Sequence, residues 1–221
     1  MQRTTKFGIL MLVMALAIAI GRLALKTDQP EPSYQGKPVS YWLTDGFTFS
    51  PSVDDRPPAE SAFRCLGANA VPFLIAKLGR TDGPLKQIYL RCYPKLPAKL
   101  RTQLPRPASA DALRGRAILS LRIIGPAANA AIPSLLNVLT NDPGAMRRAN
   151  AVVCLDTIDG GHLQTEVVDA WLRVRSDPDP EVARMATEVL RSHFPLGVLQ
   201  IENGEISLVR GGDVYEKVHK K

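Results

Sequence analysis

Two short phrases of this chain recur at matching positions, and this repetition constrains the fold more than any other feature. The phrase AVPFL at residues 70–74 returns as AIPSL at 131–135, and each copy is followed by a leucine four residues later. A second phrase places large apolar residues four and seven positions after Ala59, Ala117 and Ala151. That spacing lines one face of a helix. Each unit is therefore predicted to be a helical hairpin, which buries its apolar face only by stacking on the next unit.

Residues that begin and end helices set the limits of these repeats. Gly67 suits the left-handed backbone that ends a first helix, and Pro72 suits the first turn of a second helix. Asp142 followed by Pro143 predicts the start of the third repeat. The repeats cover about 58–79, 110–140 and 142–175, and a closing half-repeat ends near residue 191. We therefore predict an all-α fold, a short α-solenoid of helical hairpins over residues 58–192.

An insertion at residues 80–111 interrupts this array. It separates the first two copies of the repeated phrase, Ala59 and Ala117, by 58 residues, whereas the second and third copies are 34 apart. A short helix is expected over residues 85–93. Prolines follow at 94, 97, 105 and 107, and proline at this density precludes a long helix.

The segment before the array, residues 27–57, is predicted to be a linker with a docking element. Proline, serine and glycine break its first part and its last part. Between them, Tyr41, Trp42 and Leu43 predict one or two helical turns that dock on the first repeat.

The segment after the array, residues 193–221, predicts a small β-hairpin and a basic tail. Asn203-Gly204 suits a two-residue turn between two strands. This register pairs Ile201 with Ile206 and Leu199 with Leu208. Because an isolated two-stranded hairpin is marginal in water, we expect it to cap the open side of the last helix.

Residues 1–26 have the pattern of a signal peptide or membrane anchor. Arg3 and Lys6 precede residues 7–20, which carry no charge, as in a secretory signal. Cleavage before Arg22 would release a periplasmic or secreted protein. A retained anchor over residues 7–25 would leave the protein in the inner membrane, facing the periplasm, because the positive residues keep the N-terminus in the cytoplasm. Either outcome predicts an exported protein.

Charge and cysteine content narrow the class of protein further. The net charge of +7 favours solubility and weak attraction to anionic surfaces or acidic partners. The three cysteines, Cys65, Cys92 and Cys154, lie far apart and do not form the dense, even set of a disulfide scaffold. Cys65 and Cys154 fall beside core positions, so we expect both to be small buried hydrophobes.

The phrases resemble HEAT-like repeats of the bacterial type found in phycobilisome (PBS) lyases. The resemblance rests on the segments 66–72, 124–133 and 177–183. It departs from the family pattern in the insertion, in the absence of proline from the second helix of the third repeat, and in His193 where glycine would be expected. Arrays of this family act mainly as protein-binding scaffolds, and a few relatives act on bilins or bind DNA.

A second set of equivalent positions lies one residue before each core leucine of the second helices. In HEAT-like arrays these helices line the concave face, so the resemblance makes this set a possible partner-binding stripe. Packing between repeats is the alternative explanation. The stripe comprises Phe73, Lys77, Ser134, Val138, Val167 and Trp171.

The sequence contains no motif of a known catalytic or cofactor site. It has no Gly-rich phosphate loop, no G-x-S-x-G and no H-E-x-x-H. Asp156, Asp159 and His162 lie close together, but polar residues at a helix end are ordinarily exposed to water. No catalytic, metal or cofactor-binding residue is predicted, and no small-molecule ligand.

These patterns together predict a non-catalytic protein-binding scaffold in the cell envelope. The alternative is an enzyme or enzyme accessory, for example lyase-like, with a site grafted on the array. The membrane is a further partner if the N-terminal segment is uncleaved. Nucleic-acid binding conflicts with export, although the sequence offers basic residues for it: Arg114, Arg116, Arg122, Arg147 and Arg148.

Overall fold

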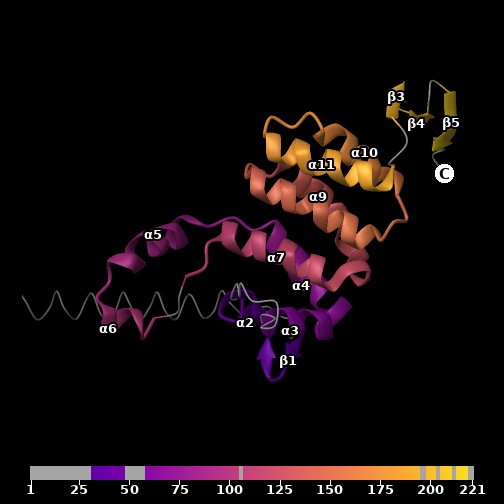
Figure 1. Cartoon of the computed structure of the whole chain (residues 1–221). Coiled ribbons are helices and arrows are strands. Elements are labelled where there is room, and N and C mark those ends of the chain that lie inside the picture. Colours follow the sequence, from indigo (N-terminus) through magenta and orange to yellow (C-terminus); the bar gives the residue numbers. More distant parts are fainter. Residues whose placement is uncertain are drawn as a thin grey trace, which may run out of the picture. The chain divides into compact units, whose positions relative to one another are not determined.

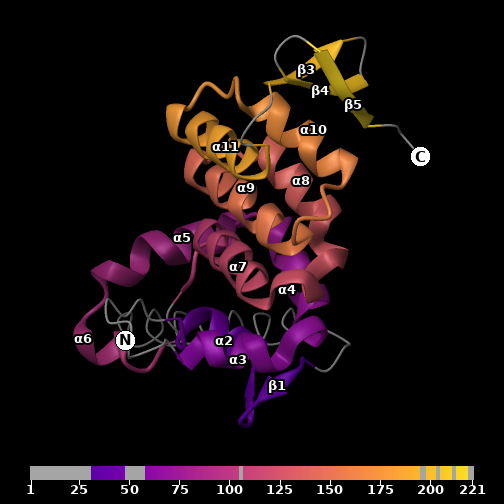
Figure 2. The ribbon, with the colours of Figure 1, turned by 45° about the vertical axis from the view of Figure 1, so that its right-hand side comes forward.

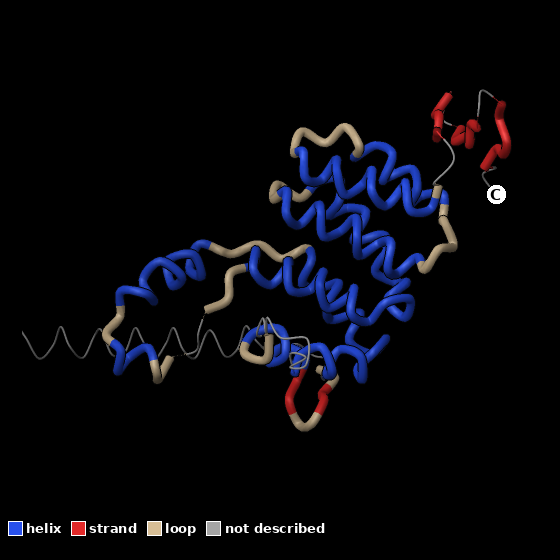
Figure 3. Tube along the Cα trace, viewed as in Figure 1, coloured by secondary structure: helices blue, strands red, loops and turns tan. Residues whose placement is uncertain are grey.

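The computed structural model describes residues 31–47, 58–104, 107–194, 198–202, 205–210 and 213–218. The chain divides into two compact units, Met1–Glu31 and Pro32–Lys221, and the description below concerns the second unit. The predicted signal or anchor segment, residues 1–26, lies outside the described residues. The described part is mostly helical, as predicted, and also contains two small antiparallel sheets (Figure 1, Figure 3).

The elements follow one another in a simple order. Before the array come β1 (Ser33–Tyr34), β2 (Lys37–Pro38) and α2 (Val39–Thr44). The helical part contains α3 (Pro58–Leu66), η1 (Gly67–Ala70), α4 (Val71–Leu78), α5 (Pro84–Cys92), η2 (Tyr93–Lys95), α6 (Ala98–Arg101), α7 (Ala110–Ile124), η3 (Gly125–Ala131), α8 (Ile132–Asn141), α9 (Ala145–Asp159), α10 (Thr165–Val174) and α11 (Pro180–His193). The C-terminal sheet is formed by β3 (Val198–Glu202), β4 (Glu205–Arg210) and β5 (Asp213–Val218).

The repeated positions of the sequence form the hydrophobic core. Ala59, Ala117 and Ala151 are all buried. The large apolar residues four positions later on α3, α7 and α9, and the matching pairs on α4, α8 and α10, are buried as well. They are Phe63, Leu121 and Leu155, and then Leu74 and Leu78, Leu135 and Leu139, and Val168 and Leu172. The helical period predicted from the repeated phrases is therefore confirmed at these residues.

The helices contact one another in two series. The first helices of the units follow one another, with α3 against α7, α7 against α9 and α9 against α11. The second helices do the same, with α4 against α8 and α8 against α10. Figure 2 shows α8 and α10 beside each other, next to α9 and α11. Each added unit thus covers apolar surface that the preceding unit would otherwise expose to water.

A glycine ends the first helix of every unit. Gly67, Gly125 and Gly160 have φ angles of 51°, 70° and 59°, values that side chains with a Cβ rarely adopt. Pro72 and Pro133 then lie in the first turns of α4 and α8, where no helical hydrogen bond needs their missing N–H. Glycine therefore ends the first helix in all three units, and proline lies at the start of the second helix in two of them.

The predicted start of the third repeat at Asp142-Pro143 is wrong by two residues, because α9 begins at Ala145. The Asp142 carboxylate instead accepts hydrogen bonds from the Gly144 N–H at 2.8 Å and from Arg147 Nε at 2.7 Å. These bonds fold a turn ahead of the helix. In α11 the residue before the helix caps it directly, since Asp179 accepts hydrogen bonds from the N–H groups of Glu181 and Val182.

In two successive hairpins an ion pair joins the first helix to the residues that follow the second helix. Arg148, in the first turn of α9, forms a bidentate pair with Asp177 beyond α10, at 2.9 and 2.7 Å. Similarly, a guanidinium nitrogen of Arg114 on α7 lies 3.5 Å from a carboxylate oxygen of Asp142, which follows α8. The Arg148 guanidinium lowers the pKa of Asp177, and the bond to Asp177 raises the pKa of Arg148. Burial strengthens such pairs, since water no longer screens the charges.

The predicted helical turns are observed as α2, which contacts α3 of the first repeat and α7 of the second. Val39, Trp42 and Leu43 of α2 are buried, and Trp42 Nε1 donates to the carbonyl of Lys37. Arg116 of α7 donates to the carbonyl of Leu43 at 2.8 Å and also to that of Thr44. It thereby satisfies carbonyl groups at the end of α2, which lack helical partners. The β1–β2 pair that precedes α2 was not predicted.

The insertion contains the predicted short helix, observed as α5, followed by η2 and α6. None of these three elements has a buried residue. The Tyr93 hydroxyl donates to the carbonyl of Arg101 at 3.0 Å and links η2 to α6. Asp82 accepts a hydrogen bond from the Ala110 N–H at 2.8 Å, so the two ends of the insertion meet although 28 residues separate them.

The C-terminal segment has the predicted strand register and one additional strand. Ile201 pairs with Ile206, and Leu199 with Leu208. The third strand, β5, pairs antiparallel with β4, so the prediction of a two-stranded hairpin with a basic tail is incomplete. The structure describes only the backbone of this sheet, so capping of the last helix by the sheet stays a prediction.

One run of the described residues, Ala110–Asn141, is long enough to cross a membrane and contains an 18-residue stretch with a mean hydropathy of 1.3. It consists of α7, η3 and α8, and the backbone departs from helical geometry at Gly125 and Ala128. Both helices contact α9. The core helices of a soluble array meet the same criterion of length and composition, so this run is weak evidence for membrane association.

Candidate partner-binding groove

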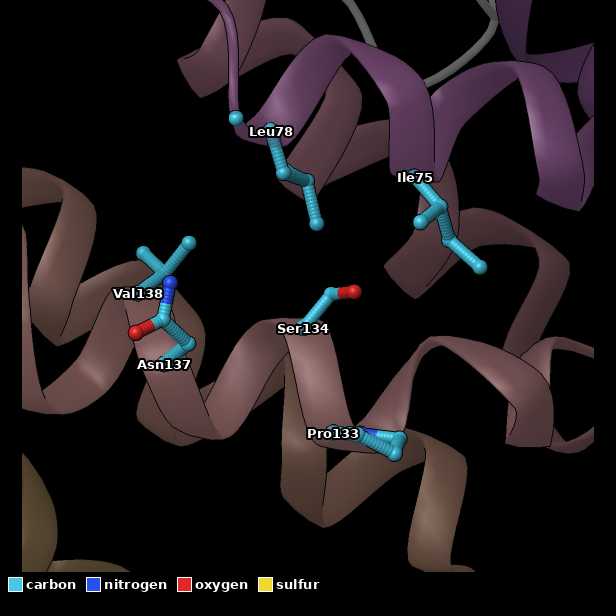
Figure 4. A pocket seen from close by; sticks show the side chains of 7 residues that line it. Ile75, Leu78, Pro133, Ser134, Asn137 and Val138 are labelled. Atoms are coloured by element: carbon cyan, nitrogen blue, oxygen red, sulfur yellow. The ribbon is translucent and has the colours of Figure 1, made fainter.

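A groove lies between the second helices of the first two units. It has a volume of about 300 Å³ and is bounded by α4 and the residue after it on one side, and by α8 on the other. Figure 4 shows Leu78 and Ile75 extending from α4 toward Ser134 on α8, with Val138 beside it. The full lining comprises Ile75, Leu78, Gly79, Pro133, Ser134, Asn137 and Val138.

The groove is apolar at its base and polar at its edge. Leu78 and Val138 are buried, Ile75 and Ser134 are half-buried, and Asn137 is exposed. The Asn137 side-chain carbonyl accepts a hydrogen bond from Asn141 Nδ2 at 2.7 Å. This bond holds the amide in one orientation, in which its NH₂ group still has donors to offer. Apolar walls with a few oriented polar groups are what ligand and side-chain pockets provide.

The structure divides the predicted six-residue stripe into three parts. Ser134 and Val138 line the groove. Phe73 and Lys77 lie half-buried on α4, with Lys77 Nζ 4.1 Å from the centre of the Phe73 ring. Val167 and Trp171 are fully buried. Those last two residues pack inside the protein, as the packing alternative expected, and offer no surface to a partner.

His193, at the end of α11, packs against Trp171. The His193 ring stacks on the Trp171 indole with an interplanar angle of 5° and a centroid distance of 5.9 Å. His193 Nε2 lies 2.5 Å from the Asp156 carboxylate. The histidine thus joins the end of α11 to α9 and covers the indole, a role that a glycine lacks.

The basic residues considered for nucleic-acid binding are largely engaged within the protein. Arg114 and Arg147 pair with Asp142, Arg148 pairs with Asp177, and Arg116 bonds to backbone carbonyls of α2. A guanidinium held in this way is not available to a phosphate without breaking its internal bonds. Arg122 is exposed.

The cysteines separate into two classes. Cys154 is buried, its Sγ lies 3.3 Å from the Ile118 carbonyl, and burial raises the pKa of its thiol to about 12. Cys65 and Cys92 are exposed, so the expectation of a buried Cys65 is wrong. The reason is its helical position: on α3 it lies about 200° around the axis from the core residue Phe63. All three thiols are free.

The acidic residues near His162 serve local structure. Asp159 is buried and accepts hydrogen bonds from the N–H groups of Leu163 and Gln164, whereas Asp156 pairs with His193 and His162 is exposed. The three therefore do not converge on one point. In the part of the chain that the structure describes, no group of three or more His, Cys, Asp or Glu side chains is arranged to hold a metal ion.

Comparison of the chain with protein-family models, with curated proteins and with solved structures finds no match. The groove between α4 and α8 could not be found from the stripe alone, because Ile75 and Asn137 belong to other positions of the repeat.

Proposed function

We propose that this protein is a short HEAT-like α-solenoid that binds a protein partner in the groove between α4 and α8. Three observations support the solenoid: the equivalent core positions, the two series of helix contacts, and the ion pairs that recur with the repeat. The groove carries the functional part of the proposal, because it combines apolar walls with polar groups at its edge.

A side chain of a polypeptide fits this groove better than a large ligand does. Its volume of about 300 Å³ is at the lower end of the range for small-molecule pockets, about 300–1,000 Å³. An apolar partner side chain would bury itself against Ile75 and Leu78. The Ser134 hydroxyl and the Asn137 amide would then offer hydrogen bonds to the partner backbone.

A photo-crosslinking amino acid placed at Asn137 tests this proposal. Crosslinking in intact cells is expected to give one defined adduct, and Ser134→Arg, which fills the groove, is expected to abolish it. The matched control carries the same photo-crosslinker at Thr157, which is exposed on α9, outside the groove lining. Equal adducts from both positions, or an adduct that survives Ser134→Arg, would contradict the proposal.

The cell envelope is the proposed location, and it rests on the sequence of residues 1–26. A reporter enzyme that works only outside the cytoplasm, fused after Lys221, is expected to be active. N-terminal sequencing then distinguishes cleavage before Arg22 from a retained anchor. A full-length, stable fusion with an inactive reporter would refute export.

A further inference from the structure

The insertion carries a concentrated excess of positive charge. Residues 83–110 contain six lysines and arginines and no aspartate or glutamate, and the net charge of the whole chain is +7. Arg91, Lys95, Lys99 and Arg101 form no ion pair among the described residues. The array shows the opposite pattern, with Arg114, Arg147 and Arg148 all paired. The insertion is therefore a concentrated cationic surface.

The same segment exposes apolar side chains. Among the described residues, four large apolar side chains are exposed, and three of them lie in the insertion: Leu85 at 80%, Ile88 at 57% and Leu100 at 44%. On α5, Leu85, Ile88 and Cys92 follow the spacing i, i+3, i+7 of one helix face. The apolar residues thus form a continuous face and are not scattered singly over the surface.

These helices have little to stabilise them within the protein. Isolated helices shorter than about 12–15 residues are marginal in water, and α5 has nine residues with none buried. Tyr93 links η2 to α6, and Asp82 links the two ends of the insertion, but neither bond covers Leu85 or Ile88. An external surface that takes up apolar groups and cations together would complete the structure.

We propose that the insertion binds the surface of an anionic lipid bilayer, with Leu85, Ile88 and Leu100 among the upper acyl chains and the lysines and arginines at the headgroups. This combination of cations with exposed aliphatic residues is typical of helices that lie in a membrane interface. Tyr89 and Tyr93, whose rings pack edge-to-face, add the amphipathic side chains favoured at that depth.

The N-terminal segment gives the second, independent reason to choose a bilayer. If the predicted anchor over residues 7–25 spans the membrane, only six residues lie between its end and Pro32. An extended chain of that length reaches about 25 Å. The array would then be held close to the lipid surface, and the resulting high local concentration makes even a weak affinity of the insertion effective. This contact is distinct from the proposed protein-binding groove.

The native cysteines supply probes for a direct test with the full chain. A polarity-sensitive dye is attached to Cys92, on the apolar face of α5, in a Cys65→Ser background. The control carries the dye on Cys65 of α3, in a Cys92→Ser background, while Cys154 is buried and unreactive. Each labelled chain is reconstituted with vesicles of phosphatidylcholine alone and of phosphatidylcholine mixed with phosphatidylglycerol.

The dye on Cys92 is expected to shift to shorter emission wavelengths, and to be quenched by brominated lipid, in vesicles that contain phosphatidylglycerol. The dye on Cys65 is expected to stay unchanged. Leu85→Asp combined with Ile88→Asp should abolish the shift. Changing Lys95, Lys99 and Arg101 to Glu should lower the ratio of bound to unbound insertion by about a hundredfold. As a control, changing Arg173 and Arg175, which are exposed on and beside α10, to Glu should leave this ratio unchanged.

Each remaining outcome decides the matter. If the chain floats with both kinds of vesicle but the Cys92 dye does not respond, the insertion does not bind lipid and the proposal is wrong. If the chain floats only with phosphatidylglycerol and the Cys92 dye responds, the proposal holds and the anchor prediction fails. A response of Cys92 to polyglutamate but not to anionic vesicles would identify a surface for acidic proteins and overturn the proposal.

Discussion

Truncation of Leu155 to alanine tests the repeat architecture most directly. Leu155 is fully buried on α9, the helix that contacts α7, α8 and α11. The change removes three buried carbon atoms, and at about 0.8 kcal/mol each the transfer to water alone costs about 2.4 kcal/mol. Because helices on several sides limit collapse of the site, the cavity adds to this cost, and we expect a total of about 3–5 kcal/mol.

The measurement is urea unfolding of the unit Pro32–Lys221, with the free energy of unfolding extrapolated to water. Leu121→Ala, at the equivalent position of α7, should give a loss within about 1 kcal/mol of the Leu155→Ala value, since both residues are fully buried. Met146→Ala is the matched control, because Met146 lies on α9 with 70% of its surface exposed, and it should change stability by less than about 0.5 kcal/mol. If Leu155→Ala were no more destabilising than Met146→Ala, the position would not be core and the repeat alignment would be wrong.

Three further predictions concern the backbone, charge and thiol chemistry. Gly125→Ala should cost about 1–3 kcal/mol, since φ is 70° there and no neighbouring atom interferes, whereas Gly115→Ala inside α7 should stabilise by about 0.5–1 kcal/mol in the same unfolding assay. Asp177→Asn should cost about 3 kcal/mol of unfolding free energy at pH 7, because it leaves Arg148 without its carboxylate partner. Since folding lowers the pKa of Asp177, the difference in stability from wild type should shrink as the pH falls below about 4. A difference that grows instead would contradict this. Cys154 should resist a thiol reagent at pH 8 in the native protein while the two exposed cysteines react, and mass spectrometry showing three modified thiols before unfolding would contradict its burial.

The sequence predicted the helical units well, because the periodic apolar residues determine which face of each helix is buried. Phe63 and Leu121 occupy the same place in their units and are both buried. Boundaries were less predictable where a side chain bonds outside the helix. Asp142 is an example, since its bonds to Gly144 and Arg147 delay the start of α9.

Features that depend on two distant segments could not be read from one stretch of sequence. The groove joins Leu78 to Ser134, residues of different units, and the Arg148–Asp177 pair joins the ends of a hairpin. The strand β5 was missed because its sequence, DVYEKV, is half charged and lacks the run of apolar and β-branched residues that predicts a strand.

The bond between Asp82 and Ala110 has a consequence for how this protein can change over time. It brings the two ends of the insertion together, and the helices on either side of the insertion, α4 and α7, contact each other directly. The closure entropy of such an excursion grows slowly, by about 0.6 kcal/mol for each doubling of its length. Residues 83–109 can therefore be lengthened, shortened or exchanged with little effect on the stability of the stacked helices. The helical array and the insertion are therefore free to evolve at different rates. A protein engineer can treat Asp82 and Ala110 as the two ends of a replaceable module.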